Sequence, residues 1–359
     1  RDVAPSRGLG DVYKRQALEQ AGIRAFGPRK NAAVIESSKV FSKNLMKKYG
    51  IPTAGYEVFS EPKKAIDYIT AQNKFPVVVK ADGLALGKGV MICQDLEEAK
   101  EAVHSIMEDK IFGASGNQVV VEEFITGPEV SVLSFTDGKT VVPMVSSKDH
   151  KRAYDGDRGL NTGGMGTISP NPHYSGEMAR RCMKEIFQPT IDAMREEGRP
   201  FQGCLYFGLM LTQDGPKVIE YNSRFGDPET QVVLPRLKTD LVEILEACID
   251  GTLKELDIQW SDEAAACVVM ASGGYPKSYP KGIEIKGLDE NGQISGATVY
   301  HAGTVYRDGR FFTNGGRVLG VTACGAGLDE ALEKAYDAVE RISFDGAHYR
   351  KDIGKIGIQ

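Results

Sequence analysis

Apolar side chains recur every three or four residues in several segments, and this spacing predicts helices with one buried face. The clearest helix covers residues 36–49, with Ser37 or Ser38 as its N-cap and Gly50 at its end. Its apolar stripe consists of Val40, Phe41, Leu45 and Met46. Further helices are expected at residues 62–70, 96–107, 176–197, 239–250 and 328–342.

Runs of β-branched residues bounded by turn-forming residues predict strands. Residues 205–211 and 217–221 flank a Gln213-Asp214-Gly215 turn, so they are expected to pair as an antiparallel hairpin. Residues 148–170 are rich in charge and glycine and are expected to form one long loop. The other strands are expected at residues 75–80, 89–93, 119–125, 129–135, 264–271, 299–305 and 317–322.

The two ends of the chain differ from its middle. Residues 1–15 show neither period and are interpreted as a disordered or foreign lead. Residues 17–28 predict the end of a helix, a short strand and a stop, an ending that normally follows earlier βα units. The composition changes after Trp260, and the strands and the helix that follow predict a compact α+β module.

Composition and charge exclude several classes of protein. Of 359 residues, 41% are hydrophobic and 26% charged, which excludes a disordered chain, a collagen-like repeat and a membrane bundle. No apolar run approaches the roughly 20 residues that span a bilayer. The net charge of −5 argues against non-specific nucleic-acid binding. An anionic ligand would therefore need a local basic patch or a metal.

The six cysteines are scattered and include no C-x-x-C pair. They are interpreted as small buried hydrophobic residues in a reducing compartment. The first 16 residues have no apolar centre typical of a secretory signal. The sequence therefore predicts a cytoplasmic protein.

A glycine-rich segment, KADGLALGKGV at residues 80–90, lies between two expected strands. Glycines allow backbone N–H groups to approach phosphate oxygens closely, and lysines supply positive charge. The spacing differs from a Walker A loop, because Gly89 stands where Ser or Thr would hold magnesium. The segment predicts either a flexible flap over a triphosphate or a plain glycine-rich hairpin.

Two adjacent acids, Glu122 and Glu123, end the apolar strand VVVEEFI ahead of a turn, and Glu129 follows that turn. A connector of this kind can offer backbone groups to an adenine, and a neighbouring acid can bind ribose hydroxyls. The alternative is that all three are solvated strand residues.

The segment VIEYNSRFGDPET at residues 218–230 carries the strongest signal for a site. Strand alternation is expected to place Glu220, Asn222 and Arg224 on one face. An acid and an amide supply the hard oxygen ligands that suit magnesium shared with phosphates. An arginine beside them can bind a transferring phosphoryl group or a carboxylate.

Basic residues and glycines also lie together in the expected long loop. SKDHKR at residues 147–152 and NTGGMG at residues 161–166 combine positive charge with glycine-borne N–H groups, which suits an anion site. A merely solvated charge run is the alternative for the first segment.

Taken together, these segments resemble the ATP-grasp superfamily and, within it, the glycinamide ribonucleotide synthetase (phosphoribosylamine–glycine ligase) family of purine biosynthesis. The resemblance runs from about Ala17 to Gln359. It implies an α/β and α+β fold: two α+β lobes that enclose ATP, a small C-terminal α+β domain and a remnant of an N-terminal βαβ domain. It is carried by SKVFSKNLMKKYGIPTAGY, VVKADGLALGKGV, VVVEEFITGPEVSV, KDHKR, NTGGMG, IEYNSRFGDPET, VVMASGGYP, TNGGRVLGVTA and RKDIG.

The resemblance also implies a role for each matching residue. Arg224, Lys80 and Asp227 would be catalytic, and Glu220 and Asn222 would bind Mg²⁺ or Mn²⁺. The residues implied to bind ATP are Lys39, Lys80, Gly87, Lys88, Gly89, Glu122, Glu123, Phe124, Ile125 and Glu129. The residues implied to line the substrate side are Asp149, His150, Lys151, Asn161, Thr162, Gly163 and Gly164.

The implied reaction joins glycine to 5-phosphoribosylamine through glycyl phosphate and needs no protein nucleophile. The implied cofactors are ATP and Mg²⁺ or Mn²⁺. The implied partners are the two substrates, and the chain is expected to act as a monomer, without nucleic acid or membrane.

The start of the chain departs from the family pattern, because nothing matches the expected G-G-R-E-H-A loop. The expected division is a lead at 1–16, an N-terminal remnant at 17–35, an ATP-grasp domain at 36–262 and a C-terminal domain at 263–359. The mobile ATP lobe is expected at about 57–127. Three alternatives stay open: an ATP-binding but catalytically incomplete fragment that makes little product, another ATP-grasp ligase of purine synthesis, or a module of a longer polypeptide.

Overall fold

The computed structural model describes residues 15, 17–83 and 89–355, and its contacts divide the chain into two compact units. Unit 1 comprises residues 1–144, 175–225 and 241–257. Unit 2 comprises residues 145–174, 226–240 and 258–359. Unit 2 therefore joins the C-terminal segment to two earlier segments of the chain.

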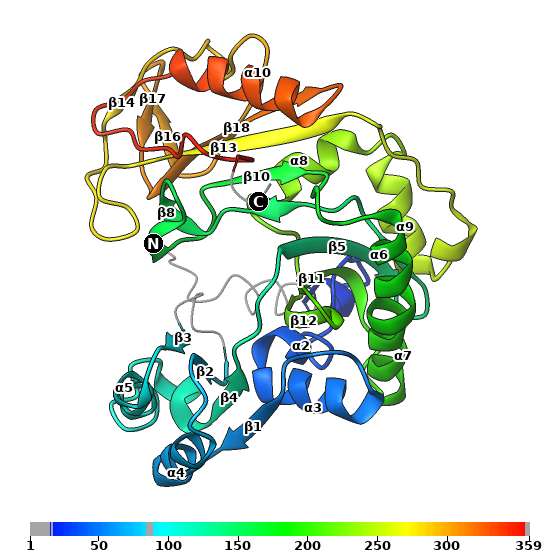
Figure 1. Ribbon diagram of the computed structural model, residues 1–359. Coiled ribbons are helices and arrows are strands. Elements are labelled where there is room, and N and C mark those ends of the chain that lie inside the picture. Colours follow the sequence, from blue (N-terminus) through cyan, green and yellow to red (C-terminus); the bar gives the residue numbers. More distant parts are fainter. Residues whose placement is uncertain (1–14, 16, 84–88, 356–359) are drawn as a thin grey trace. The chain divides into compact units, whose positions relative to one another are not determined.

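Unit 1 contains a four-stranded antiparallel sheet in the order β1-β4-β2-β3. Helices α4 and α5 pack together against this sheet (Figure 1). Their apolar residues and alternate residues of β2 and β4, such as Val79 and Val121, form one buried cluster. Lys80 and Glu122 alternate with these residues and therefore point to the opposite face. The elements are β1 (Tyr56–Phe59), α4 (Pro62–Gln72), β2 (Val77–Ala81), β3 (Val90–Cys93), α5 (Leu96–Met107), η1 (Gly113–Asn117) and β4 (Val119–Glu123).

The expected helix at residues 36–49 is divided into α2 (Val34–Ser37) and α3 (Lys39–Tyr49). Ser38 is extended, with φ −133° and ψ 113°, and its hydroxyl accepts a hydrogen bond from Phe41 N at 3.0 Å. Ser38 is thus the N-cap of α3, one of the two candidates that the sequence offered, and the break gives α3 its own N-terminus.

The second sheet of unit 1 has the order β12-β11-β5-β6, and all its neighbours are antiparallel. Phe187 packs on Phe207 at 4.5 Å between ring centroids, which places the α6–α7 segment on one face, while α9 contacts β5 and β11. The elements are β5 (Glu129–Asp137), β6 (Val141–Pro143), α6 (Gly176–Cys182), the π-helical turn η2 (Met183–Phe187), α7 (Gln188–Glu196), β11 (Gln202–Thr212), β12 (Gly215–Asn222), α9 (Leu241–Asp250) and η4 (Leu253–Glu255).

Unit 2 is built on a five-stranded sheet in the order β15-β18-β13-β10-β7. Helix α10 packs on β13 and β18, α8 contacts β10 and β13, and β13 is buried along its whole length (Figure 1). A three-stranded sheet, β14-β17-β16, and the hairpin β8-β9 complete the unit. The elements are β7 (Lys148–Asp149), β8 (Arg152–Tyr154), β9 (Arg158–Asn161), β10 (Gly166–Ser169), α8 (Thr230–Val233), η3 (Leu234–Arg236), β13 (Ala264–Ala271), β14 (Glu284–Ile285), β15 (Thr298–His301), β16 (Thr304–Arg307), β17 (Arg310–Thr313), β18 (Arg317–Gly325) and α10 (Leu328–Glu340).

Three expectations about secondary structure are wrong. Residues 148–170 form four short strands and not one loop, because β10 pairs with β13 from a distant part of the sequence. The strand expected at 299–305 is two strands, β15 and β16, that belong to different sheets. Residues 23–26 are not in a strand, and no described strand pairs with them to satisfy their backbone groups.

All six cysteines are free thiols. Five are buried and Cys324 is half-buried, as expected of small hydrophobic residues. Across the described residues, no helix is both long and apolar enough to cross a membrane.

Candidate functional site

A buried ionic cluster in unit 1 brings together two lysines and one acid from three elements. Lys80 Nζ, from β2, lies 2.9 Å from Glu122 Oε2 on β4. Lys43 Nζ, from α3, lies 3.0 Å from the same oxygen. The side chains of all three are at most 8% exposed. The cluster, here called the Glu122 cluster, contains Lys80, which the sequence predicts to contact ATP, and adds a lysine that the sequence analysis did not single out.

Lys39 lies one turn before Lys43 on α3, so the two share a helix face. Its Nζ donates to Gly83 O at 2.9 Å, at the start of the glycine-rich segment. Burial lowers the pKa of Lys39, and Glu220 is the strongest of the charges that oppose this shift, while Lys80 acts in the same direction as burial. Lys39 is therefore close to both the expected metal ligand and the second expected phosphate-binding lysine.

The glycine-rich segment joins β2 to β3, which are antiparallel neighbours, so it connects strand to strand as expected. Ala81 N donates to Gly89 O at 2.9 Å and closes the base of this hairpin. Gly87 and Lys88 lie outside the described residues, whereas Gly89 is described and buried. Asp82 accepts hydrogen bonds from Ser38 Oγ and Val40 N, both at 3.1 Å, and so ties the hairpin to the start of α3.

Glu220 and Asn222 lie on β12, opposite Gly208 and Tyr206 of β11, and therefore share one face. The register shifts between Gly208 and Leu209, and the strand ends at Asn222. The strand alternation that predicted a common face therefore covers Glu220 and Asn222 and does not extend to Arg224.

Glu36 on α2 joins these residues, although the sequence analysis did not select it. Its Oε2 accepts a hydrogen bond from Ser223 N at 2.7 Å. Burial raises the pKa of Glu36, the neighbouring Arg224 opposes that shift and Glu220 adds to it. A second acidic side chain thus lies with Glu220 and Arg224 at the end of β12.

The expected adenine connector begins at the Glu122 cluster. Glu122 is buried, whereas Glu123 and Phe124 are exposed and Ile125 is half-buried. Glu123 forms an ion pair with Lys217 at 3.5 Å. Glu129 is exposed at the start of β5, opposite Met210. Of the three acids, Glu123 and Glu129 are exposed and fit the alternative of solvated strand residues. Glu122 is buried and does not fit it.

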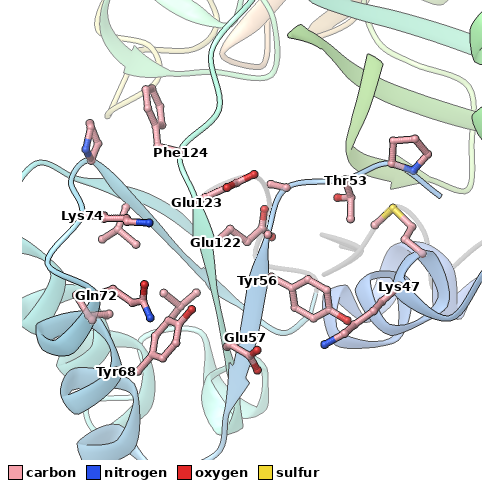
Figure 2. Close-up of a pocket in the computed structure, with 18 of the residues that line it drawn as sticks. Lys47, Thr53, Tyr56, Glu57, Tyr68, Gln72, Lys74, Glu122, Glu123 and Phe124 are labelled. Carbon is pink, nitrogen blue, oxygen red and sulfur yellow. The ribbon is translucent and has the colours of Figure 1, made fainter. Parts of the chain in front are cut away.

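A cavity of about 850 Å³ in unit 1 lies beside this connector and is shown in Figure 2. Its lining includes Glu122, Glu123 and Phe124 together with Tyr56 and Tyr68 (Figure 2). None of Lys39, Lys80 and Glu220 belongs to the lining. The cavity therefore borders the connector without containing the charges expected to meet phosphates and metal.

In unit 2, Asp149 lies on β7 and accepts a hydrogen bond from His150 N at 2.7 Å. Its removal from solvent raises the pKa of Asp149 well above the ordinary value, and Glu229 adds to the shift. Lys151 and Arg317 oppose the shift. Two carboxyl groups therefore lie near each other here, and Glu229 was not singled out from the sequence.

His150 is 2% exposed, and both ring nitrogens bond to the main chain. Nδ1 lies 3.0 Å from Gly166 O, and Nε2 accepts from Gly354 N at 3.2 Å. Burial lowers the pKa of His150 to about 4. The sequence placed His150 among residues that line the substrate side, but this geometry fits a role in holding the loop between β7 and β10.

Arg350, from the RKDIG segment, holds the same loop. Its side chain is fully buried and forms a bidentate pair with Asp352 at 2.7 and 3.0 Å. It also contacts Asp157 Oδ1 at 2.7 Å and Arg152 O at 3.1 Å. The β8-β9 hairpin is thus tied to the end of the described chain.

The NTGGMG segment turns tightly next to this loop. Lys151 O accepts hydrogen bonds from Thr162 N at 2.7 Å and Thr162 Oγ1 at 2.8 Å, and Asn161 ends β9. Gly164 has φ +108°, and a Cβ there would lie 2.6 Å from Asp149 Oδ1, so a side chain would clash. Arg317 donates to Gly163 O at 2.6 Å.

Asp227, expected to be catalytic, is bound by the same arginine: Arg317 NH2 lies 3.0 Å from Asp227 Oδ2. The structure therefore groups Asp149, Gly163, Gly164 and Asp227 in unit 2 around Arg317. The TNGGRV segment supplies this arginine and was therefore the available signal, but no local pattern predicts which residues Arg317 contacts.

Comparisons with known proteins find family models and relatives that match most of this chain. The family model described as phosphoribosylglycinamide synthetase, ATP-grasp (A) domain, matches residues 37–230, and the C domain model of the same enzyme matches residues 265–356. A phosphoribosylamine–glycine ligase of Caldanaerobacter subterraneus is 49% identical over 336 residues, which are 94% of this chain and 80% of that protein. A chicken trifunctional purine biosynthetic protein adenosine-3 is 52% identical over 94% of this chain and 34% of its own length.

Solved structures show the same relationship. The phosphoribosylamine–glycine ligase of Thermotoga maritima matches with a TM-score of 0.84 and 37% identity over 91% of this chain and 81% of that one. A biotin carboxylase of Campylobacter jejuni, at 15% identity, matches with a TM-score of 0.72 over 93% of this chain and 72% of that one, and shows the fold alone. These matches confirm the expected ATP-grasp fold. The chain therefore belongs to the phosphoribosylglycinamide synthetase (phosphoribosylamine–glycine ligase) family of ATP-grasp ligases.

Proposed function

We propose that this chain catalyses the ATP-dependent joining of glycine to 5-phosphoribosylamine, a step of purine biosynthesis, through glycyl phosphate. The observation that carries the proposal is that Lys39 lies near Lys80 and Glu220 in unit 1, and that Glu36 lies near Glu220 and Arg224. These are the charges that a triphosphate, its metal and a transferring phosphoryl group require. The family membership supplies the identity of the two substrates.

The described residues fit a bound nucleotide. Lys39 and Lys80 can meet phosphate oxygens with charge-assisted hydrogen bonds. Glu122 Oε1 is buried and has no hydrogen-bond partner among the described residues, whereas Oε2 has two ammonium partners. A buried acceptor without a partner is costly, so it suits a donor that a ligand brings, such as the amino group of adenine.

The residues near the end of β12 fit a magnesium ion that is shared with phosphates. Among the described residues, no group of three or more His, Cys, Asp or Glu side chains could hold a metal by itself. Mg²⁺ is commonly bound by one or two carboxylates together with phosphates and water. Glu220 and Asn222 would hold the ion, which neutralises phosphate charge when bound; Mn²⁺ prefers similar oxygen ligands.

The reaction proceeds in two substitutions. A carboxylate oxygen of glycine attacks the γ-phosphorus of ATP, the bond from the γ-phosphorus to the bridging oxygen breaks, and ADP leaves. The amine of phosphoribosylamine then attacks the carbonyl carbon, phosphate leaves, and the nitrogen loses a proton. Lys39 and Lys80 orient the phosphates, Arg224 stabilises charge on the phosphoryl group, and alignment supplies much of the rate enhancement.

Unit 2 would supply substrate-binding groups from Asp149, Lys151, Asn161, Thr162, Gly163, Gly164 and Asp227. His150 would position this loop from behind. We further propose that the chain acts in the cytoplasm as a monomer, in keeping with its free, mostly buried thiols and net charge of −5.

The test is to measure release of ADP with ATP, glycine and phosphoribosylamine together, and with each substrate omitted. ADP release and product formation should require all three. Calorimetry with a non-hydrolysable ATP analogue and Mg²⁺ should show about 10–100-fold weaker binding for Lys80→Met, because a charge-assisted bond contributes about 1.5–3 kcal/mol.

Lys100→Met is the matched control, because Lys100 on α5 is 40% exposed and forms an ion pair with nearby Glu97. Analogue binding that Lys80→Met leaves unchanged would remove Lys80 from the site. Binding of ATP without product would favour the catalytically incomplete fragment.

A further inference from the structure

Lys43 is buried on the nucleotide side of the first sheet of unit 1, and neither the sequence motifs nor the proposed reaction gives it a task. Its Nζ has two side-chain partners, Glu122 Oε2 at 3.0 Å and Thr53 Oγ1 at 2.7 Å. Its side chain is 3% exposed. A lysine so deeply buried is rare unless it is paired, so the partners indicate what it does.

The first partner, Glu122, is shared. Glu122 Oε2 accepts from Lys43 and Lys80 at nearly equal distances of 3.0 and 2.9 Å. One carboxylate charge thus faces two ammonium charges, and the three groups together keep one positive charge. With Lys80 alone, the same carboxylate would form a neutral pair, and this pair would offer no net charge to an approaching phosphate.

The second partner fixes where Lys43 lies. Thr53 Oγ1 donates onward to Val218 O at 2.8 Å, and Val218 N donates to Pro52 O at 2.8 Å. Val218 is on β12, the strand that carries Glu220 and Asn222. Lys43 is therefore held between the strand with the expected metal ligands and the carboxylate that pairs with Lys80.

We propose that Lys43 is a positioning residue of the nucleotide site: by sharing Glu122 with Lys80, it leaves the Lys80 ammonium free to attract the phosphates of ATP. This inference rests on the proposed function, because it assumes that Lys80 meets ATP. Lys43 itself acts through Glu122 and touches no reacting atom.

The ionisation of Lys43 agrees with this role. Burial lowers the pKa of Lys43 to about 8, and the attraction of Glu122 is the main opposing influence. The other charges that act on it are Lys80, from β2, and Glu123, from β4, and the ring of Tyr56, from β1, lies 5.6 Å from Nζ. The ammonium is thus mostly protonated at pH 7, as the charge balance requires.

The test is a charge-rescue experiment on the full chain, with calorimetry of a non-hydrolysable ATP analogue and Mg²⁺. Lys43→Met should weaken binding about tenfold, the effect of about 1.4 kcal/mol. The double variant K43M/E122Q removes both charges, so no carboxylate should then offset the positive charge of Lys80. It should bind the analogue at least about threefold more tightly than Lys43→Met, within the usual range for coupled neighbours.

A purely structural role would not give this rescue, because the double variant also replaces a buried carboxylate oxygen, which accepts hydrogen bonds, with an amide nitrogen, which donates them. Lys47→Met is the matched control: Lys47 lies one turn further along α3, is exposed and also lies 5.6 Å from the Tyr56 ring. It should bind the analogue as the wild type does.

Thr53→Val keeps the proposal testable if Lys43→Met does not fold. It removes the hydroxyl that holds Lys43 and should weaken analogue binding about threefold, whereas Thr53→Ser should restore it. Folded Lys43→Met with unchanged affinity, or a double variant no better than Lys43→Met, would overturn the proposal while Lys80→Met still loses binding. If the wild type does not bind the analogue, the proposed function fails first.

Discussion

The two units bury charged groups in contrasting ways. In unit 1, the Glu122 cluster joins side chain to side chain: two ammonium groups share one carboxylate oxygen, and the other oxygen has no partner among the described residues. In unit 2, His150 and Arg350 bond to main-chain groups and to carboxylates with matching geometry. The Glu122 cluster therefore keeps one uncompensated positive charge and one acceptor oxygen without a partner among the described residues. In unit 2, the side chains of His150 and Arg350 form their hydrogen bonds within the chain.

This difference indicates what each network depends on. A cluster with excess positive charge is completed by an anion, so its energetics should respond to nucleotide and magnesium. A network with satisfied partners should respond to whatever breaks one of its bonds, such as protonation of an imidazole. Three measurements test this contrast.

Arg350→Met should have the largest effect. Removing one partner of a buried ion pair costs about 3–5 kcal/mol, and because Asp157 is 49% exposed we expect about 3 kcal/mol here. The free energy of unfolding can be followed in urea through the fluorescence of Trp260, the only tryptophan of the chain, which lies in unit 2. Affinity for the ATP analogue should stay at the wild-type value.

The matched control is Arg310→Met, in the same unit, because Arg310 is 64% exposed and pairs with Glu284 at the surface. It should cost less than about 1 kcal/mol. Equal losses in both variants would show that the buried bidentate pair contributes no more than a surface pair does.

The stability of unit 2 should fall at acid pH because of His150. Its pKa is about 4 in the folded chain against an ordinary 6.5, so the unfolded chain binds the proton first. The neutral His150 ring therefore makes its full contribution to the free energy of unfolding above pH 6.5. This contribution is lost as the pH falls toward 4, by up to about 3 kcal/mol. Protonation also places an N–H at Nε2, where the ring now accepts from Gly354 N.

The free energy of unfolding, measured in urea at several pH values, should therefore fall less between pH 6.5 and 4 for His150→Gln than for the wild type. His301→Gln, which changes an exposed imidazole of unit 2, should keep the wild-type pH profile. Parallel profiles for wild type and His150→Gln would contradict the assignment.

Glu220→Gln should have the smallest effect on stability and a selective effect on metal dependence. Replacing one anionic ligand oxygen should raise the Mg²⁺ concentration for half-maximal analogue binding about tenfold, or about 1.4 kcal/mol. Titration of Mg²⁺ at fixed analogue concentration gives the value. Glu101→Gln, at an exposed position of α5 in unit 1, serves as the comparison for metal dependence. An unchanged midpoint in Glu220→Gln would place the metal elsewhere.

Motif chemistry made much of unit 1 predictable. Lys39, Lys80 and Glu220 were expected together, and the electrostatic influence of Glu220 and Lys80 on Lys39 shows that they lie close. Lys43 was missed because the helix at its position was judged by its apolar stripe alone. The signal was available, since a lysine four residues after Lys39 must share its helix face.

The rest could not be predicted locally. Strand β10 exists because it pairs with β13, a hundred residues away, and its own sequence, GTIS, has too few residues to show a period. Glu36 was missed for a similar reason: its contact with Ser223 joins α2 to the end of β12, and no local pattern reports that closeness. The role of His150 depends on a bond to Gly354 that only the folded unit creates.

Each unit contains a buried free cysteine, and the reaction of that cysteine with a thiol reagent would report local unfolding of the unit. Thiol reagents attack an accessible thiolate, and burial raises the pKa of Cys248 in unit 1 and of Cys267 in unit 2, both to about 12. Labelling at these positions must therefore wait for the surrounding unit to open. Mass spectrometry of the labelled peptides would give the labelling rates of Cys248 and Cys267 in one sample of the wild-type chain. Cys324, which is half-buried, should be labelled first.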